Sequence, residues 1–299
     1  PEDLVVSTDS VTATVWSNNA PKLNDFFTSS IQTTSTTGQF YYQVYQSETG
    51  SADSAVQFDI AYCDSKGSGS AYYNPLVPGN TPTRTNYGQY RSLILGDENA
   101  KFVFGGQEVE YFYALSIDRA RYKEKLLPGS FELSLSQPNN SGNHTKTFID
   151  DSSVQSSVTF TDAGRVYNIV QGSLANGVAS LNNGNTPGSG SYGFFLPDIS
   201  TILLSGPALD GTHPSSIDPD YDGGIILGTD RDSNDGTANN PERLYNAMNI
   251  TAFAGKRNFK LNSEESLSSN FIFVRARNSE FNYSENPSFI SGSTGAVLF

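Results

Sequence analysis

Hydrophobic and polar side chains alternate most regularly between Tyr111 and Ser136. In Tyr111–Ile117, large apolar or aromatic residues occupy every second position, so they share one face of an extended strand. In Phe131–Ser136, Phe and Leu alternate with Ser and Glu, which predicts a second strand with one solvated face. Gly105–Gly106 and Pro128–Gly129 are typical of turns, because Gly tolerates positive φ and Pro presets a turn value.

Similar runs of aromatic and β-branched residues predict further strands along the chain. These strands are Leu4–Val6, Val11–Trp16, Gln39–Tyr45, Ala55–Tyr62, Phe102–Phe104, Thr147–Ile149, Val154–Phe160, Arg165–Val170, two within Tyr192–Leu204, and Phe271–Arg277.

Helix signals are few. The segment Pro21–Ser30 predicts a short helix, and Pro241–Asn249 predicts another that Asn240 caps. Asp118 is placed to cap one or two helical turns in the segment that follows it.

Together these elements predict a mainly β protein, with antiparallel sheets in a sandwich-like arrangement, long loops and a few short helices. The polar segment Gln137–Asn143 is the expected domain boundary. We therefore expect a β domain at residues 1–136 and a second β-rich domain at 137–299, with the alternative that part of the second is inserted into the first. The chain stops at Phe299 in a strand pattern, so a longer polypeptide is expected.

The net charge of the chain limits the classes of binding partner that we expect. The chain has 18 Lys and Arg against 31 Asp and Glu, a formal net charge of −13. General binding to nucleic acid or to an anionic membrane needs a basic surface, so neither is expected. No apolar run is long enough to cross a bilayer, so membrane insertion is not expected either. The single Cys63 has no partner for an internal disulfide.

No catalytic set stands out, so no enzymatic activity and no cofactor are expected. The two histidines, His144 and His213, lie in polar segments away from any nucleophile motif. The carboxylate pairs Asp97–Glu98, Asp150–Asp151 and Glu264–Glu265 are adjacent in sequence, and neighbours in a strand point to opposite faces. A pair placed across a cleft for glycoside hydrolysis stays an open alternative.

One metal site is a weak candidate. Asp218, Asp220 and Asp222 followed by Gly223 match the opening of a Ca²⁺-binding loop. Position twelve of that loop is Thr229 instead of Glu, and no flanking helices are predicted. A solvated loop with Asp turns is the alternative.

A basic run interrupts this acidic chain at Arg119, Arg121, Lys123 and Lys125. One interpretation is a solvated or internally paired surface; the other is an interface that docks on an acidic neighbouring subunit. We expect interface contacts at this run, and as weaker candidates at Arg91, Arg275 and Arg277. Seven early tyrosines suit either core packing or the stacking of sugars: Tyr41, Tyr42, Tyr45, Tyr72, Tyr73, Tyr87 and Tyr90.

Several short segments of the sequence resemble segments of tail structural proteins from contractile-tailed bacteriophages, especially the T4-like phages of cyanobacteria. They are Ala61–Ser70, Tyr90–Asn99, Asp118–Lys123 with Leu127–Gly129, Tyr192–Asp198 and Arg275–Phe289.

The resemblance implies a non-enzymatic virion component of the baseplate, a wedge protein, that assembles in the host cytoplasm. Its partners would be other tail proteins and copies of itself in a symmetric ring. Two alternatives stay open: a tail-fibre or lectin-like module that recognises a host-surface glycan, and a capsule-degrading enzyme.

Overall fold

A computed structural model describes residues 4–28, 41–52, 54–69, 81–139, 142–179, 191–210, 239–250 and 255–272. The chain divides into two compact units. The larger unit is Thr12–Glu265, and the smaller one combines Pro1–Val11 with Ser266–Phe299. No helix in the described ranges has the length and hydropathy needed to cross a membrane.

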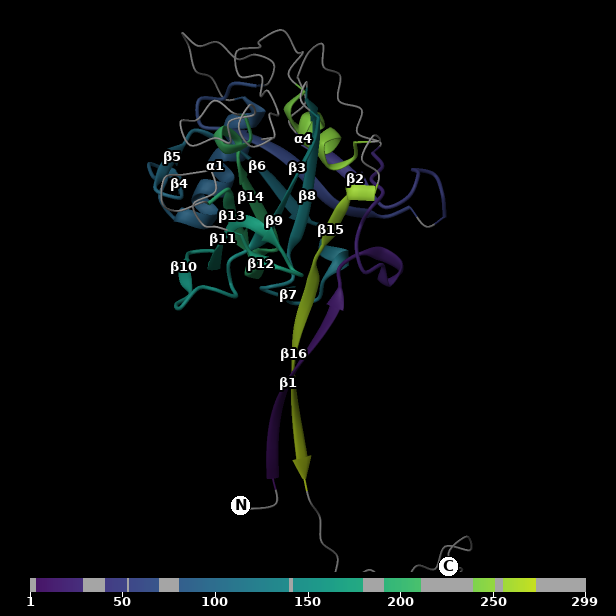
Figure 1. Ribbon diagram of the computed structural model, residues 1–299. Coiled ribbons are helices and arrows are strands. Elements are labelled where there is room, and N and C mark those ends of the chain that lie inside the picture. The colour runs from purple at the N-terminus through teal and green to yellow at the C-terminus, as the bar shows by residue number, and fades with distance from the viewer. Residues whose placement is uncertain are drawn as a thin grey trace, which may run out of the picture. The chain divides into compact units, whose positions relative to one another are not determined.

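The larger unit is built on an eleven-stranded sheet, in which the described strands pair antiparallel (Figure 1). The order along the sheet is β15-β8-β9-β11-β13-β14-β6-β3-β2, with β10 and β12 paired to β11. The prediction of a mainly β fold with antiparallel sheets is therefore confirmed. The strands are β2 Tyr41–Tyr45, β3 Val56–Asp64, β6 Tyr111–Ile117, β8 Glu132–Asn139, β9 Gly142–Asp150, β10 Thr159–Thr161, β11 Gly164–Ser173, β12 Gly177–Val178, β13 Gly193–Leu196, β14 Thr201–Ser205 and β15 Asn258–Lys260.

Strand β6, which lies between β14 and β3 in the sheet, is buried on both faces. Tyr113 and Leu115 belong to one hydrophobic cluster, whereas Phe112 and Ala114 belong to another. This is the alternation that the sequence predicts, because successive side chains of a strand point to opposite sides of the sheet. Apolar residues lie on both sides of β6, as a strand between two covering layers requires. The solvated face expected for Phe131–Ser136 is wrong, because Glu132, Ser134 and Ser136 are buried as well.

A helix that the sequence analysis did not predict covers one of these faces. Helix α1, Pro82–Leu95, packs Tyr87 and Ile94 into the second cluster together with Phe102 of β4. Its ends carry ordinary signals: the Thr81 hydroxyl accepts from the Arg84 amide, and the chain leaves through Gly96 at φ 65°. Its surface is mostly polar, which is why hydrophobic periodicity did not reveal it. The short hairpin β4 Phe102–Phe104 and β5 Gln107–Val109 lies next to it in sequence.

Other local predictions meet mixed outcomes. Instead of a helix, 21–28 is extended, with isolated bridges from Leu23 to Phe259 and from Phe27 to Tyr45. The C-terminal helix is confirmed as α4, Asn240–Met248, although it begins one residue earlier. Its cap residue is Asn239, whose side-chain oxygen caps no backbone amide and instead accepts from the Arg243 guanidinium at 2.7 Å. Val154 lies in a turn outside any strand. The remaining elements are α2 Gly206–Asp210, η1 Ser17–Asn19, η2 Arg119–Arg121, η3 Pro197–Ile199 and β7 Lys125–Leu126.

The expected domain boundary between residues 136 and 137 lies inside β8, which continues to Asn139. One sheet takes strands from both sides of that position, because β6 and β9 belong to the same ladder. The two compact units instead separate the chain near residues 11 and 265.

The described part of the smaller unit is a ribbon of two strands. Strand β1 spans Leu4–Thr14 and pairs with β16, Asn262–Ile272, so that the two ends of the described chain lie side by side (Figure 1). Within this unit the ribbon consists of Leu4–Val11 and Ser266–Ile272. Val11, Leu267, Phe271 and Ile272 expose between 43% and 72% of their surface.

Candidate interface and ligand-binding hollow

The basic run begins in a capped turn. The Asp118 carboxylate accepts from the Ala120 amide at 2.8 Å, which confirms the expected cap of a short helical turn, η2. Arg119 folds back over this turn: its guanidinium donates to the Tyr122 and Lys123 carbonyls at 2.6 and 2.9 Å and lies 4.8 Å from the Tyr122 ring centre. These bonds hold Arg119 to its own segment.

The other three cations also have partners within the chain. Arg121 donates to the Ser17 hydroxyl, and Lys123 lies 2.8 Å from Glu265. Lys125 lies 3.7 Å from Glu264, its register partner across β7 and β16. The internally paired surface considered from the sequence is therefore present. Lys123 is still 77% exposed, and an ion pair at such a surface contributes little to stability.

Of the remaining candidate interface and metal-binding residues, one lies in the described part of the chain and the others lie outside it. Arg91 lies on α1 with its guanidinium 5.8 Å from the Tyr87 ring centre, beside a small hollow of about 230 Å³. Arg275 and Arg277 lie outside the described residues, as do the three aspartates of the candidate Ca²⁺ loop, Asp218, Asp220 and Asp222. In the described ranges no group of three or more His, Cys, Asp or Glu side chains is placed to hold a metal ion.

The carboxylate pair Asp150–Asp151 is buried and structural. Asp150 accepts from the Gly129 amide at 2.9 Å, and burial raises the pKa of its carboxyl above the usual value. Asp151 accepts from the backbone and side-chain amides of Asn168 at 2.8 and 2.9 Å. These bonds join the end of β9 to the neighbouring strand β11, so the pair fixes a turn of the sheet.

The tyrosines divide between packing and surface. Tyr42 and Tyr87 are buried in the two clusters, and burial, with Glu242 and Tyr245 nearby, raises the pKa of Tyr42 to about 12. Tyr90 shares a 2.8 Å hydrogen bond with Ser116, and Tyr41 is 42% exposed. Tyr72 and Tyr73 lie outside the described residues.

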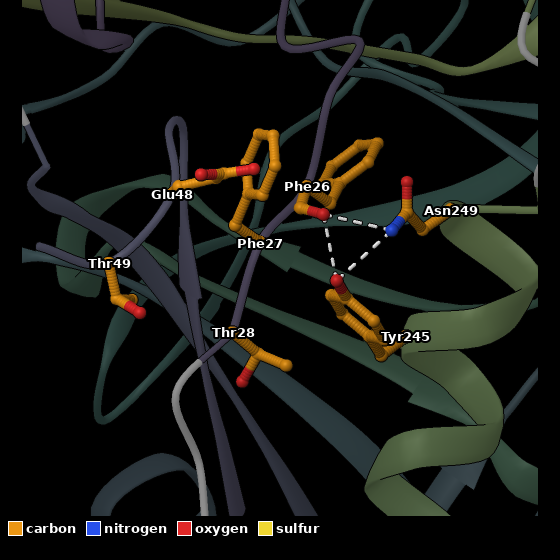
Figure 2. A pocket seen from close by; sticks show the side chains of 7 residues that line it. All are labelled: Phe26, Phe27, Thr28, Glu48, Thr49, Tyr245 and Asn249. Atoms are coloured by element: carbon orange, nitrogen blue, oxygen red, sulfur yellow. Dashed lines mark hydrogen bonds between the residues drawn. The ribbon is translucent and has the colours of Figure 1, made fainter. Parts of the chain in front are cut away.

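A hollow of about 450 Å³ opens beside α4, and the sequence analysis did not anticipate it. Figure 2 shows its lining residues, which come from three separate segments. They are Phe26, Phe27, Thr28, Glu48, Thr49, Tyr245 and Asn249.

One side of the hollow is held by a compact hydrogen-bond network. The Tyr245 hydroxyl and the Asn249 amide donate to the Phe26 carbonyl at 2.7 and 2.8 Å, as the dashed lines in Figure 2 show. Arg257 donates to the Asn249 side-chain oxygen at 2.8 Å, which orients that amide. Burial raises the pKa of Tyr245 above its usual value, so its hydroxyl stays protonated and able to donate at neutral pH.

The hollow depends on contacts between residues distant in the sequence. Phe27 pairs with Tyr45 at the end of β2, with backbone N–H to carbonyl distances of 2.8 and 3.0 Å, which brings it beside Glu48 and Thr49. The sequence predicts a helix at Phe27, and Glu48 lies between the predicted strands Gln39–Tyr45 and Ala55–Tyr62. The apolar spacing of Leu23, Phe26 and Phe27 is that of a helix face, so the local pattern favours a helix and gives no sign of the strand-like pairing.

No protein-family model matches this chain, and no curated protein or solved structure matches it significantly.

Proposed function

We propose that this protein is a non-enzymatic structural component of a phage contractile tail, most specifically of the baseplate, and that it acts by assembling with copies of itself and other tail proteins. The observation that carries the proposal is the β1–β16 ribbon. It has few ways to bury its own apolar surface, so association with another chain is the natural means to stabilise it.

The ribbon has the chemistry of a pairing surface. In the described ranges the smaller unit contains one charged residue, Asp9, within a chain of net charge −13. Soluble proteins usually protect exposed strand edges with Lys, Pro or bulges. The described ribbon strands contain neither Lys nor Pro, and β1 is the terminal strand of its described sheet.

The resemblance of sequence phrases to phage tail proteins supports the placement in a virion. The similar segments lie in different secondary-structure elements, including the end of β3, the end of α1 and the turn η2. They are therefore not one local motif. The basic run would supply a second contact, chiefly through the exposed Lys123.

The test is to locate the chain in an image reconstruction of the phage particle whose genome encodes it. We expect density for repeated copies in a symmetric ring at the baseplate, with the ribbon buried against a neighbour. Purified virions that lack the chain, or density at the tip of a fibre alone, would contradict the proposal.

A further inference from the structure

We propose that the hollow beside α4 binds one neutral sugar residue, through the Phe27 ring and the Glu48 carboxylate. This inference does not rest on the tail assignment, because it follows from the side chains that line the hollow. A ligand site of this kind would let an assembly protein also attach to a carbohydrate surface.

The wall formed by α4 is already organised. Tyr245 and Asn249 both donate to the Phe26 carbonyl, and Arg257 holds the Asn249 oxygen from the other side. These polar groups therefore satisfy one another without a ligand. A preorganised wall lowers the entropy that a ligand must lose on binding.

The ligand-facing groups lie on the other side of the hollow. The Phe27 ring is half-buried, and both Glu48 and Thr49 are exposed. The Glu48 carboxylate makes no ion pair or hydrogen bond with other residues in the part of the chain that the structure describes. The hollow thus offers an apolar ring, a strong acceptor and a hydroxyl on the same side.

A sugar residue has the matching surfaces. Its C–H groups form a weakly positive, apolar face that suits the negative face of an aromatic ring. Its neighbouring hydroxyls are donors that a carboxylate can accept as charge-assisted hydrogen bonds. The volume of about 450 Å³ lies within the range of small-molecule sites and is larger than one sugar ring needs, so the hollow is open to a longer chain.

Charge and composition exclude other ligand classes. Among the described residues that line the hollow there is one acid and no base, so a phosphate or a sialylated glycan would meet repulsion. An apolar ligand would cover the Glu48 carboxylate and the Thr49 hydroxyl without giving them hydrogen bonds. Hydrolysis of a glycosidic bond ordinarily uses two carboxylates, and Glu48 is the one carboxylate among the lining residues that the structure describes, which favours binding over hydrolysis.

Saturation-transfer NMR and calorimetry on the full chain would test the proposal. The probes are methyl glucoside, methyl mannoside, methyl galactoside and their neutral trisaccharides, with sialyllactose and arginine amide as charged comparisons. We expect at least one neutral probe to bind. Phe27→Leu should weaken it roughly three- to tenfold, because it keeps the volume and removes the ring face. Glu48→Gln should weaken it by about the same factor.

Two matched variants serve as controls. Phe160→Leu changes an exposed aromatic ring outside the hollow, and Glu108→Gln changes an exposed carboxylate on β5. Both should leave the affinity unchanged, and all four variants should keep the unmodified thermal midpoint. Equal affinity for monosaccharide and trisaccharide would support a single-residue site, and a rise with length would support a polysaccharide ligand. Failure of every neutral probe would overturn the proposal, as would binding of arginine amide alone.

Discussion

Glu132 and Lys260 lie directly opposite each other on β8 and β15, and the Lys260 ammonium is 2.7 Å from a Glu132 carboxylate oxygen. The Glu132 side chain is only 5% exposed and also accepts from the Leu174 amide at 2.6 Å and from Asn258. Burial alone would raise the pKa of Glu132, but these donors outweigh it and hold that pKa below the usual value. The pair therefore ties the last strand of the sheet to its neighbour through a charged carboxylate.

Acid should weaken this connection. Because the folded pKa of Glu132 lies below its unfolded value, its stabilisation is present above the unfolded pKa and is lost as pH falls through the folded pKa. Glu132→Gln should lower the free energy of unfolding by about 1–3 kcal/mol at pH 7, and by less at about pH 3. Urea unfolding at both pH values measures this. The exposed control Glu108→Gln should stay within about 0.5 kcal/mol, and a Glu132→Gln effect of equal size at both pH values would contradict the mechanism.

Gly164 is required by both its backbone conformation and its surroundings. Its φ is +99°, and an added Cβ would lie 2.5 Å from an Asp198 carboxylate oxygen. That carboxylate accepts from the Arg165 backbone amide at 2.8 Å and from its guanidinium at 2.7 Å. Gly164→Ala should therefore disturb the Arg165–Asp198 pair as well as strain the backbone.

Gly50 provides the matched control for this prediction, because its φ is +105° and nothing lies within 4 Å of an added Cβ. Gly50→Ala should cost about 1–2 kcal/mol of unfolding free energy from backbone strain alone. Gly164→Ala should cost about 1–3 kcal/mol more, because it adds overpacking. Denaturant unfolding of the two variants measures the difference, and equal costs would show that Asp198 moves aside freely.

The ribbon should be sensitive to charge. Leu267 and Phe271 are 43% and 51% exposed on β16. Replacing both with Lys should raise the dissociation constant of any self-assembly at least about tenfold, because the apolar surface that an interface would bury is lost. Light scattering would then report more of the 32.3 kDa monomer. Leu93→Lys, at a 51% exposed position on α1, is the control. An unchanged mass distribution in the double variant would count against the ribbon as the assembly surface.

Lys123 separates the two interpretations of the basic run. Its pair with Glu265 is exposed, so Lys123→Glu should change the free energy of unfolding by less than about 1 kcal/mol. If the run docks on an acidic neighbour, the same variant should assemble poorly into particles, because charge reversal destroys complementarity. Incorporation into virions, measured against unmodified chain in the same infection, is the readout. Normal incorporation would leave only the intrachain role.

Local patterns predicted the parts of this protein whose structure depends on near neighbours. The alternation of Tyr111–Ile117 was enough to assign β6 and its two faces, and Asp118 was enough to assign a capped turn, because strand periodicity and capping act over a few residues. Local signals did not predict α1, because most of its surface is polar. Its apolar residues Tyr87 and Ile94 stabilise the helix only when they pack into the second hydrophobic cluster.

Tertiary structure decided which residues share a site. Phe27 and Glu48 lie in segments that carry no common motif, and the strand pairing of Phe27 with Tyr45 places them in one hollow with α4. Three cations of the basic run, Arg121, Lys123 and Lys125, likewise have partners more than a hundred residues away along the chain: Ser17, Glu265 and Glu264. The amino-acid order by itself determined a β-rich, acidic chain with defined turns. Long-range packing decided the site, because those contacts form only when distant segments are brought together by burying a common core.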